Sequence, residues 1–199
     1  MTLTWLGQNC FKIEGKSGSL VLNPFISTKT QRLPKNADAF LFVRPMPEKD
    51  VAAITGESLS ITTPGEYEIK ELLIAGQPAG DKGETVFRIV ADGVHVGYIG
   101  EQATFDEAAA DLLEGVDVLV LPVGGGVVLD ASGAGAVVSK IEPRIVVPIE
   151  TAEMVGGKQA SVEQFCKELG ITKPDAVKKL SLLRKDLPAD ETMLVLFES

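Results

Sequence analysis

Residues 117–125 read DVLVLPVGG, and this run decides the fold class of the second half of the chain. The strand expected here, Val116 to Val123, is almost continuously apolar, which is typical of a strand buried on both faces. A helix is predicted at Ala131 to Ile141, and a second apolar strand at Arg144 to Ile149. Strand, helix and strand in this order predict an α/β layer.

The first half of the chain is rich in short β-strands joined by tight turns. Gly15-Lys16-Ser17-Gly18 and Asp92-Gly93 have the composition of hairpin turns. A short helix is expected at Glu48 to Ile54, and residues 26–37 are predicted to form a loop because they are polar and contain Pro34. The other expected elements are strands at Thr2 to Leu6, Cys10 to Glu14, Ser19 to Leu22, Phe40 to Val43, Ser58 to Thr62, Leu72 to Ala75, Thr85 to Val90, Val94 to Ile99, Leu180 to Leu183 and Met193 to Phe197, and helices at Phe105 to Leu113 and Ser161 to Leu169.

Composition indicates one compact domain spanning residues 1–199. A hydrophobic content of 45% is enough to bury a sizeable core at this length. The net charge of −9 argues against a nucleic-acid backbone or an anionic membrane as the main partner. Because no 18-residue apolar stretch or signal peptide is seen, a soluble cytoplasmic protein is expected. Cys10 and Cys166 are predicted to be reduced core thiols.

Four short sequence motifs, in a fixed order along the chain, resemble those of a known protein superfamily. They are TWLGQNCF at residues 4–11, NPF at residues 23–25, PGEYE at residues 64–68 and DVLVLPVGG at residues 117–125, with IEPRIVVP at residues 141–148 behind them. Their order and spacing resemble the metallo-β-lactamase fold superfamily, and most of all its small bacterial Zn-dependent hydrolases, the branch that includes the ascorbate-phosphate lactonases. The resemblance implies a four-layer αββα sandwich, with a metal site in the cleft at one edge of the two sheets.

The resemblance also implies where the metal ligands would lie, and this chain lacks them. Relatives carry the run His-x-His-x-Asp-His after the strand that ends here at Val43, whereas residues 44–50 read RPMPEKD. Arginine stays protonated and lysine is a cation at neutral pH, so both repel a divalent ion. The middle histidine has no counterpart in residues 76–83. The former ligand positions are Gln8, Arg44, Met46, Glu48, Lys49, Glu101 and Glu150, and Asn23 stands where relatives have aspartate.

Two interpretations of the remaining carboxylates stay open. Glu48, Glu101 and Glu150 could gather into a site for a hard ion such as Mg²⁺ or Ca²⁺. Alternatively, Arg44 or Lys49 neutralises Glu101 and Glu150, and RPMPEKD is then a structural plug in a former metal loop. The plug is the favoured hypothesis.

Other candidate residues are expected to have structural roles. His95 alternates with valines and is predicted to be an ordinary strand residue, because zinc catalysis normally needs two or three imidazoles or thiolates. The glycines at residues 124–126 are predicted to form a structural turn, since the loop lacks the Lys-Ser/Thr of a phosphate-binding loop. Asn23, Glu66 and Tyr67 are expected to line the cleft.

The sequence therefore predicts a catalytically inactive member of the superfamily, with no zinc or other cofactor, which acts by binding. Its partner would be an unknown protein, such as an active relative that it regulates, or a small ligand. The alternatives are a metal-dependent hydrolase with a carboxylate site unlike that of the family, at Glu48, Glu101 and Glu150, and an enzyme that takes a small acidic metabolite through Arg44 and Lys49. Self-association into a homo-oligomer is a further alternative, because related hydrolases often assemble.

Overall fold

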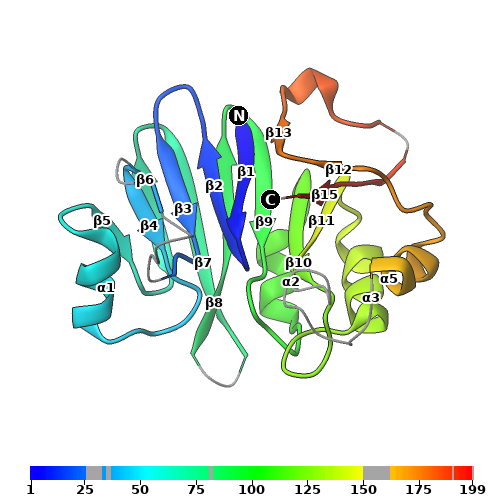
Figure 1. Cartoon of the computed structure of the whole chain (residues 1–199), viewed down its shortest axis with the longest axis horizontal. Helices are drawn as coiled ribbons and strands as arrows, with labels where there is room; N and C mark the ends of the chain where they lie inside the picture. The colour runs from blue at the N-terminus through cyan, green and yellow to red at the C-terminus, as the bar shows by residue number, and fades with distance from the viewer. Residues whose placement is uncertain (26–32, 35–36, 81–82, 150–161, 190, 199) are drawn as a thin grey trace.

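Two large β-sheets form the centre of the protein (Figure 1). The computed structural model describes residues 1–25, 33–34, 37–80, 83–149, 162–189 and 191–198. The six-stranded sheet has the order β13 (Lys179–Ser181), β1 (Thr2–Gly7), β2 (Cys10–Glu14), β3 (Ser19–Leu22), β4 (Ala39–Leu41) and β5 (Leu59–Ile61). The seven-stranded sheet has the order β14 (Met193–Leu194), β11 (Ile145–Ile149), β10 (Val118–Pro122), β9 (Val94–Tyr98), β8 (Glu84–Ala91), β7 (Leu72–Ala79) and β6 (Gly65–Ile69).

Helices cover the outer faces of both sheets. Helix α1 (Glu48–Thr55) packs on the six-stranded sheet, where Val51 joins Val21, Phe40 and Phe42. On the seven-stranded sheet lie α2 (Glu107–Leu113), α3 (Ala131–Ile141) and α5 (Val162–Leu169) (Figure 1). The layers therefore follow the order αββα, which confirms the predicted sandwich. Two short strands, β12 (Ala176–Val177) and β15 (Leu196–Phe197), and the 3-10 turn η1 (Arg184–Asp186) complete the described elements.

The run DVLVLPVGG contains β10, which is buried on both faces as predicted. It pairs in parallel with β9 on one side and with β11 on the other. Val118 and Val120 belong to the core between the sheets, whereas Leu119 and Leu121 belong to the core under the helices. Each of these side chains is fully buried, and each burial stabilises the fold by about 2 kcal/mol. Because β10 packs against a core on each of its faces, its sequence is apolar at every position.

Tertiary contacts shift some of the predicted boundaries. β7 continues past Ala75 to Ala79, because Ala79 pairs with Glu84 and packs in the core under the helices. Helix α2 begins two residues later than predicted, since the Asp106 side chain caps it by accepting a hydrogen bond from Ala109 N at 2.8 Å. The strand predicted at Met193 to Phe197 is divided: β14 pairs with β11, and β15 pairs with β12.

Cys10 and Cys166 lie in different parts of the core, and both thiols are free and buried. Cys10 packs in the cluster under α1, and Cys166 packs in the cluster around α3 and α5. Burial raises the pKa of both thiols. Among the described residues, no helix has the length and apolar character needed to cross a bilayer.

Asp38 ties the two sheets together beside the turn between β2 and β3. Its Oδ2 accepts a hydrogen bond from Ser19 N at 2.8 Å, and its Oδ1 lies 2.6 Å from Nζ of Lys70, in the turn between β6 and β7. The two turns approach so closely that a Cβ on Gly18 would lie 3.0 Å from Cβ of Lys70. The Lys70 hydrogen bond lowers the pKa of Asp38, and the hydrogen bond from Ser19 acts in the same direction.

We expect Asp38→Asn to lower the free energy of unfolding by about 1 kcal/mol at pH 7, because it removes a charged acceptor in a partly exposed pair. A lowered pKa in the folded state stabilises the protein above the unfolded value of about 3.9, and the effect is lost as the pH falls through the folded value. The difference between wild type and variant should therefore vanish in acid. Urea unfolding at several pH values measures it, with Asp111→Asn on the exposed face of α2 as the control; a pH-independent difference would contradict this account.

Candidate functional site

Two loops meet at one edge of the sandwich, one after β4 and one after β9. Gly100 has a φ of 75°, and a Cβ on it would lie 2.9 Å from Cγ1 of Val43, so only glycine permits this approach. The carbonyl oxygen of Val43 also accepts a hydrogen bond from Thr85 N at 2.8 Å, at the start of β8. Arg44 and Glu101 are the next residues in the two loops. The contact therefore brings their side chains together.

Arg44 forms an ion pair with Glu101 across the two sheets. Its Nη1 lies 2.5 Å from Oε2 of Glu101, and its Nη2 donates a hydrogen bond of 3.1 Å to the backbone carbonyl of the same residue. Its Nε lies 3.8 Å from Oε1 of Glu84, whose side chain is only 6% exposed. The Glu101 side chain is 22% exposed. A half-buried, charge-assisted contact of this kind is stronger than an ordinary surface ion pair.

Two asparagines complete the set of donors around Glu101. Nδ2 of Asn9 and Nδ2 of Asn23 donate to its Oε1 at 2.9 and 3.1 Å. Asn23 follows β3 with a φ of 47°, a left-handed conformation that asparagine tolerates better than most residues. Asn9 is buried, and its carbonyl oxygen accepts a hydrogen bond from the fully buried hydroxyl of Tyr98. Donors from three segments of the six-stranded sheet thus converge on one carboxylate of the other sheet.

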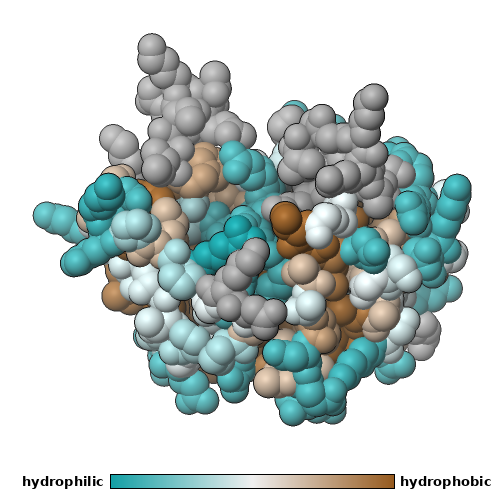
Figure 2. All heavy atoms as spheres, turned by 90° about the horizontal axis from the view of Figure 1, so that it is seen from below, coloured by the Kyte–Doolittle hydropathy of each residue, from teal (hydrophilic) through white to brown (hydrophobic). Residues whose placement is uncertain are grey.

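A cavity of about 240 Å³ opens beside this network. It is lined by Gln8, Asn9, Asn23, Pro24, Phe25, Arg44, Pro45, Met46 and Glu101. β3, β4 and β9 all end at the lower edge of the sandwich in Figure 1. Figure 2 shows this edge from below, with hydrophilic residues at its centre and hydrophobic residues beside them. We call this space the Arg44 cavity.

The structure brings together only part of the predicted set. Gln8, Asn23, Arg44, Met46 and Glu101 line the Arg44 cavity. Of the two cations proposed to neutralise the carboxylates, Arg44 makes the contact. Two positions, Glu48 and Lys49, are exposed in the first turn of α1 and are not among the residues that line the cavity. Glu150 lies outside the described residues.

Glu66 and Tyr67, expected to line the same cleft, lie elsewhere. They line a separate groove of about 390 Å³ over β6, β7 and β8. The Tyr67 hydroxyl donates a hydrogen bond of 3.0 Å to the carbonyl oxygen of Thr63. His95 lies in β9, where its Nδ1 is 2.8 Å from Nη2 of Arg88. Burial lowers the pKa of His95, and the charge of Arg88 acts in the same direction.

Sequence reasoning missed two residues of the network, Asn9 and Glu84. Asn9 could have been found, because it lies in the motif TWLGQNCF directly after a former ligand position. Glu84 carries no such signal. It begins β8 and is 5% exposed, and its proximity to Arg44 depends on the pairing of Thr85 with Val43.

The described residues that line the Arg44 cavity do not fit a zinc ion. Zinc in proteins is held by thiolates, imidazoles and carboxylates, usually with two or three of the first two kinds. Glu101 supplies the carboxylate among the described lining residues, and its oxygens already accept from Arg44, Asn9 and Asn23. The guanidinium remains protonated at every physiological pH and cannot be a ligand.

The fold and its matched sequence identify the family. The family model of the β-lactamase superfamily domain matches residues 2–150, well over half of the chain. The chain therefore belongs to the β-lactamase superfamily, with the metallo-β-lactamase fold described above.

Solved structures show the same fold. A protein of Thermotoga maritima assigned to the Zn-dependent hydrolases of the metallo-β-lactamase superfamily is similar, with a TM-score of 0.82 and 22% identity over 98% of this chain and 97% of that one. Igni18, a metallo hydrolase of the archaeon Ignicoccus hospitalis, has a TM-score of 0.67 and 19% identity over 91% of this chain and 98% of that one. A diphosphatase of the PhnP family has a TM-score of 0.67 and 12% identity over 91% of this chain and 97% of that one. At these identities the likeness supports the fold alone.

A double-mutant cycle on Arg44 and Glu101 should reveal a coupling energy of about 1–2 kcal/mol, because either alanine variant alone leaves the other side chain without its main contact. Arg44→Ala, Glu101→Ala and the double variant are compared by chemical unfolding. Lys49→Ala, at an exposed position, serves as the control and should change stability by less than about 0.5 kcal/mol. Additive effects of the two substitutions would show that the ion pair does not hold this edge.

Proposed function

We propose that this protein is a catalytically inactive member of the metallo-β-lactamase fold that acts by binding, with the guanidinium of Arg44 in place of a catalytic metal. One observation carries the proposal: Arg44 reaches from the loop where the family has its metal ligands and contacts both the carboxylate and the carbonyl of Glu101. Under this proposal, the positive charge at this edge comes from the Arg44 side chain and not from a bound metal ion.

Electrostatics supports the exclusion of a metal from this position. A divalent cation bound to Glu101 would lie within a few ångströms of a guanidinium that cannot lose its proton. Two like charges at about 4 Å repel each other by about 4 kcal/mol at an effective dielectric constant near 20, and a doubly charged ion doubles this penalty. Asn9 and Asn23 would also have to release Glu101, to which both donate. The network therefore disfavours binding of the divalent cation on which hydrolysis in this family depends.

The two enzyme alternatives have less support. A carboxylate metal site would require Glu48, exposed on α1, to reach Glu101 after Arg44 has left it. An enzyme for a small acidic metabolite would require Arg44 to exchange Glu101 for the substrate, and Lys49 is not among the residues that line the cavity. No contact of the described residues favours either arrangement.

Binding is the role that this fold can retain without chemistry, because core packing and active-site ligands are largely separate demands on a sequence. We propose a cytoplasmic protein whose partner is another protein, such as an active relative that it regulates. The net charge of −9 supports a protein partner over nucleic acid or an anionic membrane.

Elemental analysis of the protein purified without chelator should find less than about 0.1 equivalent of metal, because the donor set offers no zinc geometry. The melting temperature should not respond to Zn²⁺, Mn²⁺, Mg²⁺ or EDTA, since a ligand stabilises the folded state only if it binds there. An active zinc hydrolase of the same fold, treated identically, is the control. Near-stoichiometric metal with a melting temperature that falls in EDTA would overturn the proposal and favour the carboxylate-based hydrolase.

A further inference from the structure

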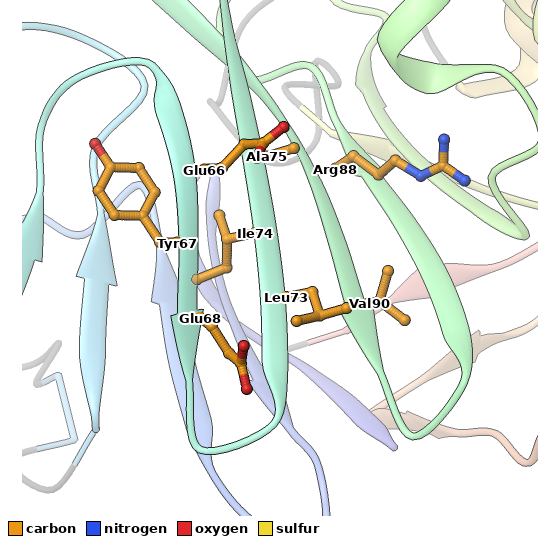
Figure 3. Close-up of a pocket in the computed structure, with 8 residues that line it drawn as sticks. All are labelled: Glu66, Tyr67, Glu68, Leu73, Ile74, Ala75, Arg88 and Val90. Atoms are coloured by element: carbon orange, nitrogen blue, oxygen red, sulfur yellow. The ribbon is translucent and has the colours of Figure 1, made fainter.

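A groove on the outer face of the seven-stranded sheet is separate from the Arg44 cavity and shares no lining residue with it. Eight residues of β6, β7 and β8 line it, and six of them form two cross-strand rows on the outer face, Glu66–Ala75–Arg88 and Glu68–Leu73–Val90. Figure 3 shows these side chains on three neighbouring strands. Residues between them along the strands, such as Ile74 and Ile89, point into the core between the sheets.

The groove is the part of this sheet face that the helix layer leaves uncovered. At the other end of the same strands, Ala79 and Val86 are buried in one cluster with Ala109, Ala110 and Leu113 of α2. Helix α2 does not cover the part of these strands that forms the groove. There, Leu73 is 48% exposed, and Val90 and Ala75 are half-buried. An apolar floor beside a helix layer is the kind of surface that another helix covers in proteins of this architecture.

The accessible charge of the groove is negative. Glu66 and Glu68 are exposed in the edge strand β6, and neither has an ion pair within the described part of the chain. Arg88 does not neutralise them, because its guanidinium is used elsewhere. Its Nη1 donates to the carbonyl oxygens of Leu112 and Glu114 at 3.3 and 3.1 Å, and in Figure 3 its side chain points away from both glutamates.

We propose that this groove is a docking site for a basic amphipathic helix of a partner protein. Apolar side chains of that helix would pack on Leu73, Ala75 and Val90, beside α2, and its lysines or arginines would pair with Glu66 and Glu68. Such a helix extends the existing helix layer to the edge of the sheet. This names a surface and a partner class for the proposed binding role, and it holds whether or not the Arg44 cavity binds metal.

Charge favours this occupant over a second copy of the chain. A two-fold contact through β6 would bring the glutamates of one copy close to those of the other, and like charges across paired strands are destabilising. The net charge of −9 adds long-range repulsion between copies. The same charge attracts a basic helix, so steering and local pairing act in the same direction.

The test uses a synthetic helical peptide of about 18 residues, long enough to form helix in isolation, with leucines on one face and lysines on the other. A peptide with glutamate in place of lysine is the matched probe. Fluorescence anisotropy measures affinity, and backbone amide NMR locates the site. Glu66→Lys combined with Glu68→Lys, and Leu73→Ser alone, remove the two parts of the groove. Glu57→Lys combined with Glu168→Lys gives the same charge change elsewhere, and Leu59→Ser, at a leucine that is 52% exposed in β5, is the apolar control.

We expect the lysine peptide to bind with amide shifts confined to β6, β7, β8 and the end of α2, and the glutamate peptide not to bind. Each groove variant should weaken binding by about tenfold, and each control by less than about twofold. Equal losses in groove and control variants, or shifts on another face, would overturn the proposal. A dimer in solution that Leu73→Ser dissociates would also overturn it, in favour of a second copy.

Discussion

The close approach of Val43 and Gly100 is the constraint on which the edge of the sandwich depends. Because Gly100 has no side chain, its backbone packs directly on Val43, and this contact brings the loops after β4 and β9 together. The contact sets Arg44 against Glu101, and Glu101 in turn gives Asn9 and Asn23 their common acceptor. The polar network is thus a consequence of an apolar contact one residue earlier in each loop.

A guanidinium and a divalent ion place different demands on such an edge. A metal needs ligands with lone pairs in a fixed geometry and leaves a position open for chemistry. Arginine supplies several N–H donors, a permanent charge and no open position. Under the proposed function, the same two loops that could position a reaction now serve to hold two sheets together and to shape a small polar cavity. The sandwich can be kept under such a change, because its cores are held by apolar side chains rather than by the polar residues of the edge.

Much of the fold could be predicted because its signals are local. The apolar run of β10 and the turns at Gly15–Gly18 and Asp92-Gly93 depend on neighbouring residues only. The loss of family ligands in RPMPEKD could also be read directly from the sequence. Whether Arg44 or Lys49 pairs with Glu101 could not. It depends on the contact between Val43 and Gly100, which sets Arg44 against Glu101 and which no local sequence signal shows. Glu66 and Tyr67 lie away from the Arg44 cavity because β6 is an edge strand separated from β9 by β7 and β8, and this strand order cannot be read from any single strand.

The measurement that tests the central claim most directly is a crystal structure of the protein grown with excess Zn²⁺, with anomalous scattering recorded at the zinc absorption edge. The account predicts no anomalous peak in the Arg44 cavity, and Arg44 in contact with the carboxylate and carbonyl of Glu101. A zinc peak on Glu101, with Arg44 turned away from it, would contradict the account and return the protein to the metal-dependent members of its superfamily.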